Sequence, residues 1–343
     1  MLRIAIGDPH LTGYESDKLD SDNLPKRLGY IIKSLNYIVE YGKKKNIYNY
    51  DIVGDLVNDK SIIYSVAQDA FKEFLIRNKD CNFVLISGNH DLSATGITQK
   101  SAISVFCEYD NVHIIPYEPE VIGNITYIPY THDFINTIKL MKPNTILISH
   151  LGLNEAMLQS GLSKVDKVTL KDIRGFKLAI LGHYHKPQNF GNESVMVWYP
   201  GSLVPVNWND KNEIKRFLIY DTETLKVESV SINCGIPGFR EYVIETEDQK
   251  NEILKLAEIS QNFGDTVRIR NKTKEKLDLG IDSATLVLEQ QEVDITQRGI
   301  NLAQTKDEQF KRYMEIKEVK EIDRPEYLNI IAKYDLLRNK DKK

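Results

Sequence analysis

Histidine and carboxylate side chains recur in short motifs whose residue types could bind metal ions. Five such motifs stand at or near the ends of apolar runs: Gly7-Asp8-Pro9-His10, Gly54-Asp55, Gly88-Asn89-His90-Asp91, Ser149-His150 and Gly182-His183-Tyr184-His185. Together they contain five of the seven histidines of the chain. Imidazole nitrogen and carboxylate oxygen are ligands that divalent transition metals bind. The motifs therefore indicate a metal centre, provided that the fold brings these distant segments together.

Taken singly, most of these motifs have a simpler explanation. An isolated Asp8-x-His10 is more often a surface turn, Gly-Asp is a common turn dipeptide, and His150 alone is more often a partly buried structural histidine. The segments around Asn89 and His183 carry more weight, because a glycine allows a tight turn after which several polar side chains crowd one point. The order of all five, each after an apolar strand, favours one shared site.

Strand and helix patterns alternate over residues 1–235 and predict an α/β fold. Helices are expected around Leu28–Val39, where apolar residues recur at helical spacing, and over Ser65–Arg77. Since ligands bind at the carboxyl ends of strands in open α/β sheets, the motifs are expected at that edge. The predicted strands are Leu2–Ile6, Asp51–Val53, Phe83–Ile86, Val112–Ile115, Ile125–Ile128, Thr145–Ile148, Leu178–Leu181, Val195–Tyr199 and Phe217–Tyr220.

The composition is that of an ordinary soluble protein. The chain has 343 residues, 41% of them hydrophobic and 27% charged, with a net charge of −4, so nucleic-acid binding would need local basic patches. The three cysteines form no C-x-x-C pair, which favours a reducing compartment. No apolar run approaches the ~18 residues of a spanning helix, and the first strand leaves no room for a signal peptide. A cytoplasmic protein is expected.

The pattern of predicted strands and helices changes near residue 235. The breaker cluster Cys234–Gly238 is a candidate boundary. A small α+β unit is expected after it, with strand patterns at Arg240–Ile244, Asp265–Arg270 and Ala284–Glu289 and a helix over Asn251–Ser260. From about residue 306 the chain is charged and helical, and Tyr327–Leu337 carries an apolar stripe.

The ordered set of five motifs resembles the calcineurin-like metallophosphoesterase superfamily over residues 1–235. Tyr199-Pro200-Gly201-Ser202, the α+β unit and Thr266–Arg270 are similar to the SbcD-type meiotic recombination nucleases, including phage recombination endonucleases. The resemblance implies two stacked mixed sheets flanked by helices over residues 1–235. It further implies an α+β capping domain that contacts DNA over 236–305 and a C-terminal helical segment over 306–343.

The resemblance also implies a dinuclear site that Asp55 bridges. Asp8, His10 and His185 would complete the first metal site. His90 would face the phosphate, and Asp91 would orient the His90 ring. The mixed nitrogen and oxygen shell favours Mn²⁺, with Fe²⁺, Zn²⁺ and Mg²⁺ as alternatives. The second metal site would be completed by Asn89, His150 and His183.

The implied activity is phosphodiester hydrolysis by a two-metal mechanism in DNA recombination, repair or replication. It would be a 3′–5′ exonuclease on duplex ends and an endonuclease on single strands. The implied partners are DNA, an SMC-like ABC ATPase of the SbcC type that the C-terminal helices would dock, and a second copy of the chain. The setting would be a bacterial or phage-infected cytoplasm. Candidate DNA contacts are Asn58, Lys164, Lys167, Lys171 and Arg174.

Several alternatives stay open. Asn58 stands where many relatives have a histidine, which puts that position's role in doubt, because an amide carries no proton at neutral pH. A solvated helix face explains the four basic residues equally well. The same metal site would serve a phosphatase or a phosphodiesterase acting on a substrate other than DNA. A non-catalytic binding module is a third reading, but such a protein is expected to have lost ligands, and here every expected ligand is present.

Overall fold

The computed structural model describes residues 1–14, 19–60, 62–93, 100–141, 144–156 and 167–273, together with the backbone of 286–290. The chain divides into two compact units. The first contains Met1–Glu241 and Glu258–Val267, and the second contains Tyr242–Ala257 and the described residues from Arg268 on. The predicted helical segment 306–343, with its Tyr327–Leu337 stripe, lies outside the described residues.

Two six-stranded mixed sheets form the first unit. The first sheet has the order β12-β11-β1-β2-β3-β4, in which β1 to β4 are parallel and β11 is antiparallel to both β1 and β12. Its strands are β1 (Leu2–Ile6), β2 (Asn49–Ile52), β3 (Asn82–Ile86), β4 (Val112–Ile115), β11 (Arg216–Asp221) and β12 (Val227–Ser231).

The second sheet has the order β5-β6-β7-β8-β10-β9. Strands β6, β7, β8 and β10 run parallel, and the two edge strands β5 and β9 are antiparallel to their neighbours. The strands are β5 (Glu120–Ile122), β6 (Ile125–Ile128), β7 (Ile146–His150), β8 (Leu178–Gly182), β9 (Gln188–Gly191) and β10 (Met196–Tyr199).

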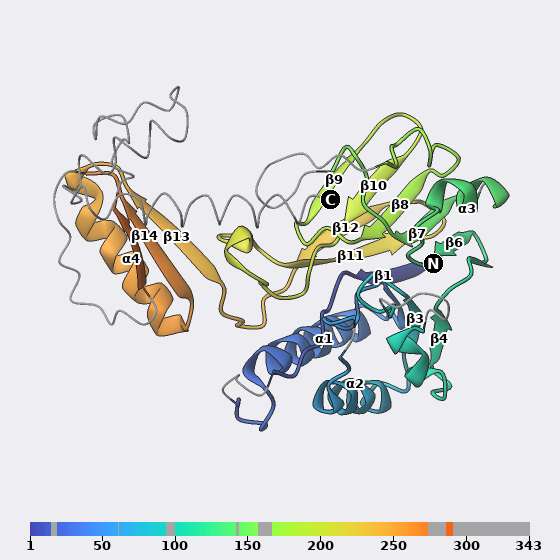
Figure 1. Cartoon of the computed structure of the whole chain (residues 1–343), viewed down its shortest axis with the longest axis horizontal. Helices are drawn as coiled ribbons and strands as arrows, with labels where there is room; N and C mark the ends of the chain where they lie inside the picture. Colours follow the sequence, from blue (N-terminus) through green and yellow to red (C-terminus); the bar gives the residue numbers. More distant parts are fainter. Residues whose placement is uncertain are drawn as a thin grey trace, which may run out of the picture. The chain divides into compact units, whose positions relative to one another are not determined.

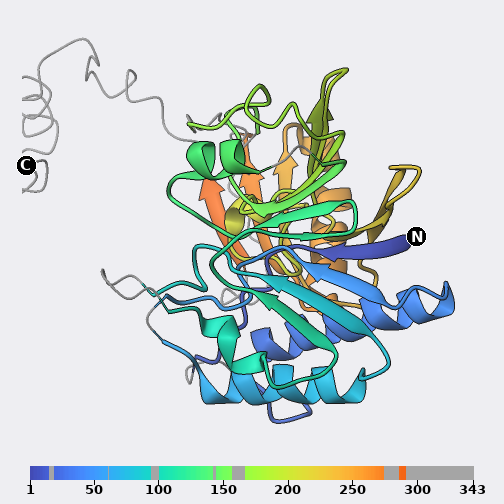
Figure 2. The same ribbon diagram turned by 90° about the vertical axis from the view of Figure 1, so that its right-hand side faces the viewer.

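The two sheets pack face to face, and helices cover their outer faces (Figures 1 and 2). Helices α1 (Lys26–Lys44) and α2 (Ser65–Arg77) cover the outer face of the first sheet and bury a large apolar cluster against it. A second cluster lies between the sheets, where Ala5 and Val53 meet residues such as Ile148 and Ile180. A third covers the outer face of the second sheet, under α3 (Phe134–Leu140). The predicted fold of two stacked mixed sheets flanked by helices is confirmed.

Besides two short 3-10 helices, four elements of this unit were not predicted from the sequence, namely the edge strands β5, β9 and β12 and the short helix α3. The three strands have at most five residues, and each pairs on one side only. Their side chains are mostly half-buried or exposed, so they lack the buried apolar run that marks a central strand. The central strands are found within two residues of their expected ends, which is the usual uncertainty of element boundaries.

Beyond these two sheets, a three-stranded sheet has the order β13-β14-β15, and a helix α4 (Lys250–Phe263) follows β13 in the chain. The strands are β13 (Phe239–Ile244), β14 (Thr266–Asn271) and β15 (Leu286–Gln290), close to the predicted α+β pattern. Among the described residues, no helix combines the length and the hydropathy needed to cross a lipid bilayer.

A buried ion pair joins the two large sheets at the end remote from the metal-ligand motifs. Asp51 on β2 accepts two hydrogen bonds from the Arg3 guanidinium, at 2.6 and 2.9 Å. The hydroxyls of Tyr127 on β6 and Tyr220 on β11 also donate to Asp51, each at 2.7 Å. All four side chains are buried. Since Tyr127 belongs to the second sheet and the others to the first, the Asp51 carboxylate fixes the two sheets relative to each other.

Arg3→Met is expected to lower the free energy of unfolding by about 3–5 kcal/mol, because it leaves the Asp51 carboxylate buried without its cation. The double variant Arg3→Met/Asp51→Leu should recover part of this loss. Arg77→Met is the control, since Arg77 pairs with Glu73 on the exposed face of α2, where such a pair contributes less than about 1 kcal/mol. Urea unfolding measures all three. Equal losses in Arg3→Met and Arg77→Met would contradict this account.

Candidate metal centre

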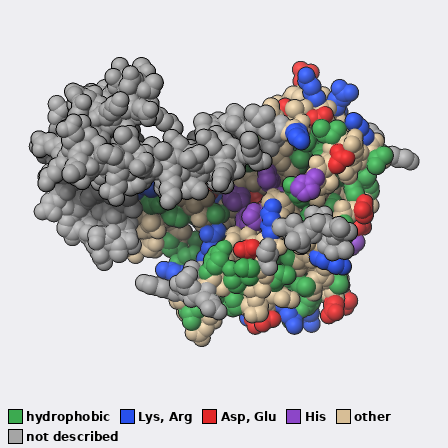
Figure 3. Space-filling view, in the orientation of Figure 1, with side chains coloured by type: hydrophobic (Ala, Val, Ile, Leu, Met, Phe, Trp, Pro, Cys, Tyr) green, Lys and Arg blue, Asp and Glu red, His purple; other side chains and the backbone are tan. Residues whose placement is uncertain are grey.

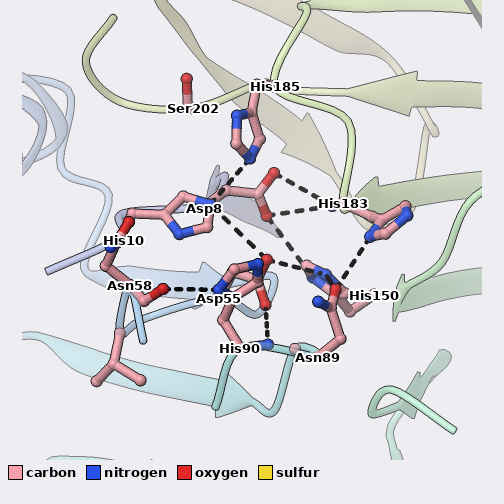
Figure 4. A network of polar contacts seen from close by, with 12 residues as sticks. Asp8, His10, Asp55, Asn58, Asn89, His90, His150, His183, His185 and Ser202 are labelled. Atoms are coloured by element: carbon pink, nitrogen blue, oxygen red, sulfur yellow. Dashed lines mark hydrogen bonds and ion pairs between the residues drawn. The ribbon is translucent and has the colours of Figure 1, made fainter. Parts of the chain in front are cut away.

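The five motifs meet at the carboxyl ends of strands from both large sheets (Figure 4). Three of the strands, β1, β2 and β3, belong to the first sheet, and β7 and β8 belong to the second. Because parallel strands end at the same edge of a sheet, the segments that follow them lie side by side. The side chains that converge there are Asp8, His10, Asp55, Asn89, His90, His150, His183 and His185.

Asp55 lies at the middle of this group. Its Oδ2 atom is 3.4 Å from His150 Nε2 and 3.7 Å from His10 Nε2. Ligand atoms of Asp8, Asp55 and His150 all lie within 4.8 Å of one another. Beside Asp55, His10 Nε2 is 2.9 Å from His185 Nε2. One carboxylate oxygen thus lies close to a histidine from each of the two large sheets.

The Asn89 amide oxygen closes the other side of the site. Its Oδ1 atom lies 3.1 Å from His150 Nε2 and 3.1 Å from His183 Nδ1. The atoms that approach one another here and around Asp55 are imidazole nitrogens and carboxylate or amide oxygens. Such a gathering is unfavourable by itself and favourable around a cation.

Unsatisfied nitrogen atoms also show that the residues fit divalent metal ions. His10 and His185 turn their Nε2 atoms toward each other, and a hydrogen bond between them can use only one proton. His10 Nδ1 is buried and has no hydrogen-bond partner among the described residues. Two buried carboxylates, those of Asp8 and Asp55, lie in the same cluster. Buried charges of this kind are usually paired or coordinate metals, so the donor set suits a metal pair.

Backbone groups hold these side chains in place. The carbonyl of Val53 accepts from His150 Nδ1 at 2.9 Å, which fixes the ring and directs its Nε2 atom toward Asp55 and Asn89. The His90 backbone N–H donates to Asp55 Oδ1 at 2.8 Å, so the Oδ2 atom of Asp55 faces the histidines. The His183 backbone N–H donates to the Asp8 carboxylate at 3.1 Å.

The backbone is strained at three of the converging residues. His10, Asp55 and His183 have φ angles of 52°, 49° and 98°, in the left-handed region that disfavours side chains. Such residues cost about 1–3 kcal/mol each and cluster at functional sites. Gly182 has no space for a side chain either, because a Cβ atom there would lie 2.1 Å from the Val53 carbonyl oxygen. Bringing these groups together therefore lowers the stability of the fold.

Burial and mutual charge shift the pKa values of the cluster. Burial lowers the pKa of His10 to about 3, and burial raises the pKa of Asp8 to about 7. Burial would raise the pKa of Asp55, yet the neighbouring histidines, above all His150, place it well below its usual range. Burial also opposes a charged His150, but Asp55 and Asp8 raise its pKa to about 9. A proton on His150 thus balances Asp55 at neutral pH, and a divalent ion would replace that proton.

The structure corrects one expected contact. His90 Nδ1 donates to the backbone carbonyl of Asn58 at 2.7 Å, so Asn58, and not Asp91, orients the His90 ring. The buried Asp91 carboxylate instead accepts from the backbone N–H groups of Gly88, Leu56 and Val57 at 2.8, 3.2 and 2.9 Å. Asp91 therefore joins the segment after β2 to the segment after β3. A sequence motif does not show which neighbour a side chain reaches.

The predicted DNA contacts are not gathered in the site. Lys167, Lys171 and Arg174 are exposed on turns rather than on a helix face, and Lys164 lies outside the described residues. Asn58 lies beside the site, where its side chain donates to the Tyr14 hydroxyl at 3.1 Å. The two histidines outside the motifs, His113 and His132, are on the surface.

Sequence reasoning missed two contributors to the site. Ser202 and Lys215 lie behind His185 and both donate to its backbone carbonyl. Ser202 could have been suspected from the Tyr199–Ser202 segment. Lys215 stands in the charged stretch 210–215, which in the sequence resembles an exposed turn.

A family profile described as calcineurin-like phosphoesterase matches residues 1–187, a range that contains every one of the converging side chains. The chain belongs to the calcineurin-like phosphoesterases. Members of this family are hydrolases that act on phosphoester bonds and bind divalent metals. This calcineurin-like phosphoesterase has three buried side chains, those of Asp8, Asp55 and His150, that could together hold a metal ion.

The chain is also similar to particular proteins. It is 24% identical over 216 residues to exonuclease subunit 1 of Enterobacteria phage T4, which covers 60% of this chain and 62% of that relative. The chain thus spans less than two thirds of the length of the relative. Among solved structures, a dimetal phosphatase from Danio rerio has a TM-score of 0.39 at 12% identity and covers 68% of this chain and 99% of its own. A phosphoesterase from E. coli has a TM-score of 0.35 at 12% identity, with 68% and 100% covered.

Asp91→Ala is expected to lower the free energy of unfolding by at least about 2 kcal/mol, because buried backbone N–H groups lose their acceptor. His90→Ala removes the adjacent side chain and should cost less than about 1 kcal/mol. Chemical denaturation of both variants without added metal makes the comparison. If Asp91→Ala were as stable as His90→Ala, the structural role given to Asp91 would be wrong.

Proposed function

We propose that this protein is the nuclease subunit of a DNA-processing complex and hydrolyses phosphodiesters with two divalent metal ions, Mn²⁺ foremost. The observation that carries the proposal is the convergence of three carboxylate or amide side chains and four histidines on both sides of Asp55. Asp8, His10 and His185 would complete the first metal site, and Asn89, His150 and His183 the second. When bound, the two ions would supply an activated water and charge stabilisation for in-line displacement at phosphorus.

His90 supplies proton transfer in this proposal. Its Nδ1–H is held by the Asn58 carbonyl at 2.7 Å, so Nε2 is the ring atom that can exchange a proton with a substrate. His90 is only partly buried, unlike His10 and His150. Its position suits a general acid that protonates the departing sugar oxygen.

A groove beside the site favours a nucleic-acid strand over a small phosphoester. Its volume is about 460 Å³, and its walls carry two cations and three aromatic rings, with no carboxylate among those lining residues that the structure describes. In a chain with a net charge of −4, a groove that gathers two cations suits an anionic ligand. The residues that give it this character are Tyr14, Lys26, Arg27, Tyr30, Pro205 and Phe239.

Two hydrogen bonds link one wall of the groove to the proposed catalytic residue His90. The Tyr14 hydroxyl accepts from the Asn58 side chain, and the Asn58 backbone in turn holds His90. Lys26 Nζ lies 5.9 Å from the centre of the Tyr30 ring. Aromatic rings stack bases and cations neutralise phosphates in channels for single strands. Figure 3 shows histidine side chains at the surface in the middle of one face, with Lys and Arg side chains nearby.

The relative in phage T4 supports the same substrate and a multi-subunit assembly, because its name describes an exonuclease subunit. We therefore propose DNA cleavage as 3′–5′ exonuclease and single-strand endonuclease, within recombination, repair or replication in a bacterial or phage-infected cell. An SMC-like ABC ATPase and a second copy of the chain are the proposed partners.

His90→Ala is expected to lower DNA cleavage by about 10²–10⁴-fold while two Mn²⁺ ions still bind, because His90 moves a proton and holds no metal. Asp55→Asn should remove both cleavage and binding of a metal pair. End-labelled duplex DNA, circular single-stranded DNA and bis-p-nitrophenyl phosphate, each with Mn²⁺ or Mg²⁺, measure activity, and calorimetry measures metal binding. Purified His90→Ala with wild-type cleavage would remove His90 from the mechanism. Wild type that hydrolyses only the small ester would point to a substrate other than DNA.

Lys26→Ala and Tyr14→Ala should raise the KM for single-stranded DNA and leave hydrolysis of bis-p-nitrophenyl phosphate within about twofold of wild type. Each stacked base contributes about 1–3 kcal/mol, and the loss of one phosphate contact lowers the salt dependence of binding by about one unit. Lys72→Ala is the matched control, because Lys72 is an exposed residue of α2 that does not line the groove. An unchanged KM for DNA in both groove variants would show that the strand binds elsewhere.

A further inference from the structure

A buried ammonium group lies directly behind the metal centre. Lys215 immediately precedes β11, and its side chain is only 6% exposed. Its Nζ atom donates to Glu213 Oε2 at 2.6 Å, to Asp210 Oδ1 at 2.9 Å and to Ser202 Oγ at 2.9 Å. A fourth acceptor, the backbone carbonyl of His185, is 3.4 Å away. The three N–H bonds of the ammonium thus face four acceptors from three different segments, and the His185 carbonyl is the farthest of these acceptors.

Further hydrogen bonds hold the acceptors of the Lys215 cluster in place. Asp210 is buried, and its second carboxylate oxygen accepts from the backbone N–H groups of Val206 and Asn207 at 2.6 and 3.1 Å. Ser202 is buried as well, and its hydroxyl donates to the Val204 carbonyl. A buried charge is tolerated only where it is paired and hydrogen-bonded, and each group here meets that condition. The ammonium therefore occupies a single position.

The segment that carries His185 depends on this cluster for its position. His185 lies in irregular backbone between β8 and β9. Its carbonyl accepts from the Ser202 backbone N–H at 3.1 Å as well as from Lys215. The approach is so close that a Cβ atom on Gly201 would lie 2.6 Å from that carbonyl oxygen. The His185 ring points the other way, with Nε2 at 2.9 Å from His10 Nε2.

We propose that Lys215 is a positioning residue for the metal centre: by holding the His185 carbonyl, it fixes the His185 imidazole at the first metal position. This inference rests on the proposed two-metal site. Lys215 touches neither metal nor substrate in this proposal and acts only through His185. Groups that orient metal ligands in this way change metal affinity by about 10–100-fold when removed.

A double-mutant cycle on Mn²⁺ binding tests the inference. The variants are Lys215→Met, His185→Ala and the double variant, and Mn²⁺ binding is measured by calorimetry and by the EPR signal of free Mn²⁺. Lys215→Met should weaken one of the two Mn²⁺ sites by about 10–100-fold and leave the other unchanged. In the His185→Ala background, Lys215→Met should have no further effect, because the residue through which it acts is gone.

Two further variants separate positioning from general destabilisation. Tyr220 lies on β11, the strand that Lys215 precedes. Tyr220→Phe removes a buried hydrogen bond to Asp51, away from the ligands, so it should lower the unfolding midpoint without changing Mn²⁺ affinity. The triple variant Lys215→Met/Asp210→Asn/Glu213→Gln removes the ammonium without leaving buried unpaired carboxylates. It should fold and show the same weakened Mn²⁺ site, and it replaces Lys215→Met in the cycle if that variant does not fold.

The outcomes are distinct. Wild-type Mn²⁺ affinity in Lys215→Met or in the triple variant would overturn the role of Lys215 while the metal centre stands. Equal losses in the wild-type and His185→Ala backgrounds would also overturn it, because Lys215 would then act independently of His185. If the wild-type protein itself bound no Mn²⁺ pair, the proposed function would fail, and the Lys215 proposal with it.

Discussion

The structure depends on the convergence of buried carboxylate, amide and imidazole groups around Asp55. These groups come from the ends of five strands in two sheets, and every one of them prefers water or a cation to its neighbours. Bringing them together costs desolvation and places His10, Asp55 and His183 in left-handed backbone. Other contacts of the fold must stabilise this arrangement. The buried clusters around Asp51 and Lys215 are two such contacts.

Strand β11 connects two of these contacts. Lys215, just before the strand, holds the His185 carbonyl at the metal centre, and Tyr220, near its other end, donates to Asp51. Since β11 is antiparallel to β1, Tyr220 pairs with Arg3, while Asp8 and His10 follow the opposite end of β1. The two sheets are therefore joined at both ends of their strands, by buried charge in each case. The apolar core between them supplies most of the stability, and the charged clusters fix the register in which the ligands meet.

The sequence predicted the fold and the members of the site better than the contacts among them. Apolar β-branched runs revealed the central strands, and polar residues just after these runs identified the converging side chains. The edge strands β5, β9 and β12 were not predicted because their side chains are mostly half-buried or exposed and form no continuous apolar run. The hydrogen bond from His90 to the Asn58 carbonyl, and the bond from Lys215 to His185, join segments about 30 residues apart. Such contacts follow from how loops fold over a strand end, and residue type alone does not reveal them.

The most direct measurement is anomalous X-ray diffraction at the manganese absorption edge from crystals of the full chain soaked in MnCl₂. Our account predicts two anomalous peaks flanking Asp55, one beside His10 and His185 and the other beside Asn89, His150 and His183. No peak near Asp55, or a single peak that leaves either group of histidines without a ligand, would contradict it.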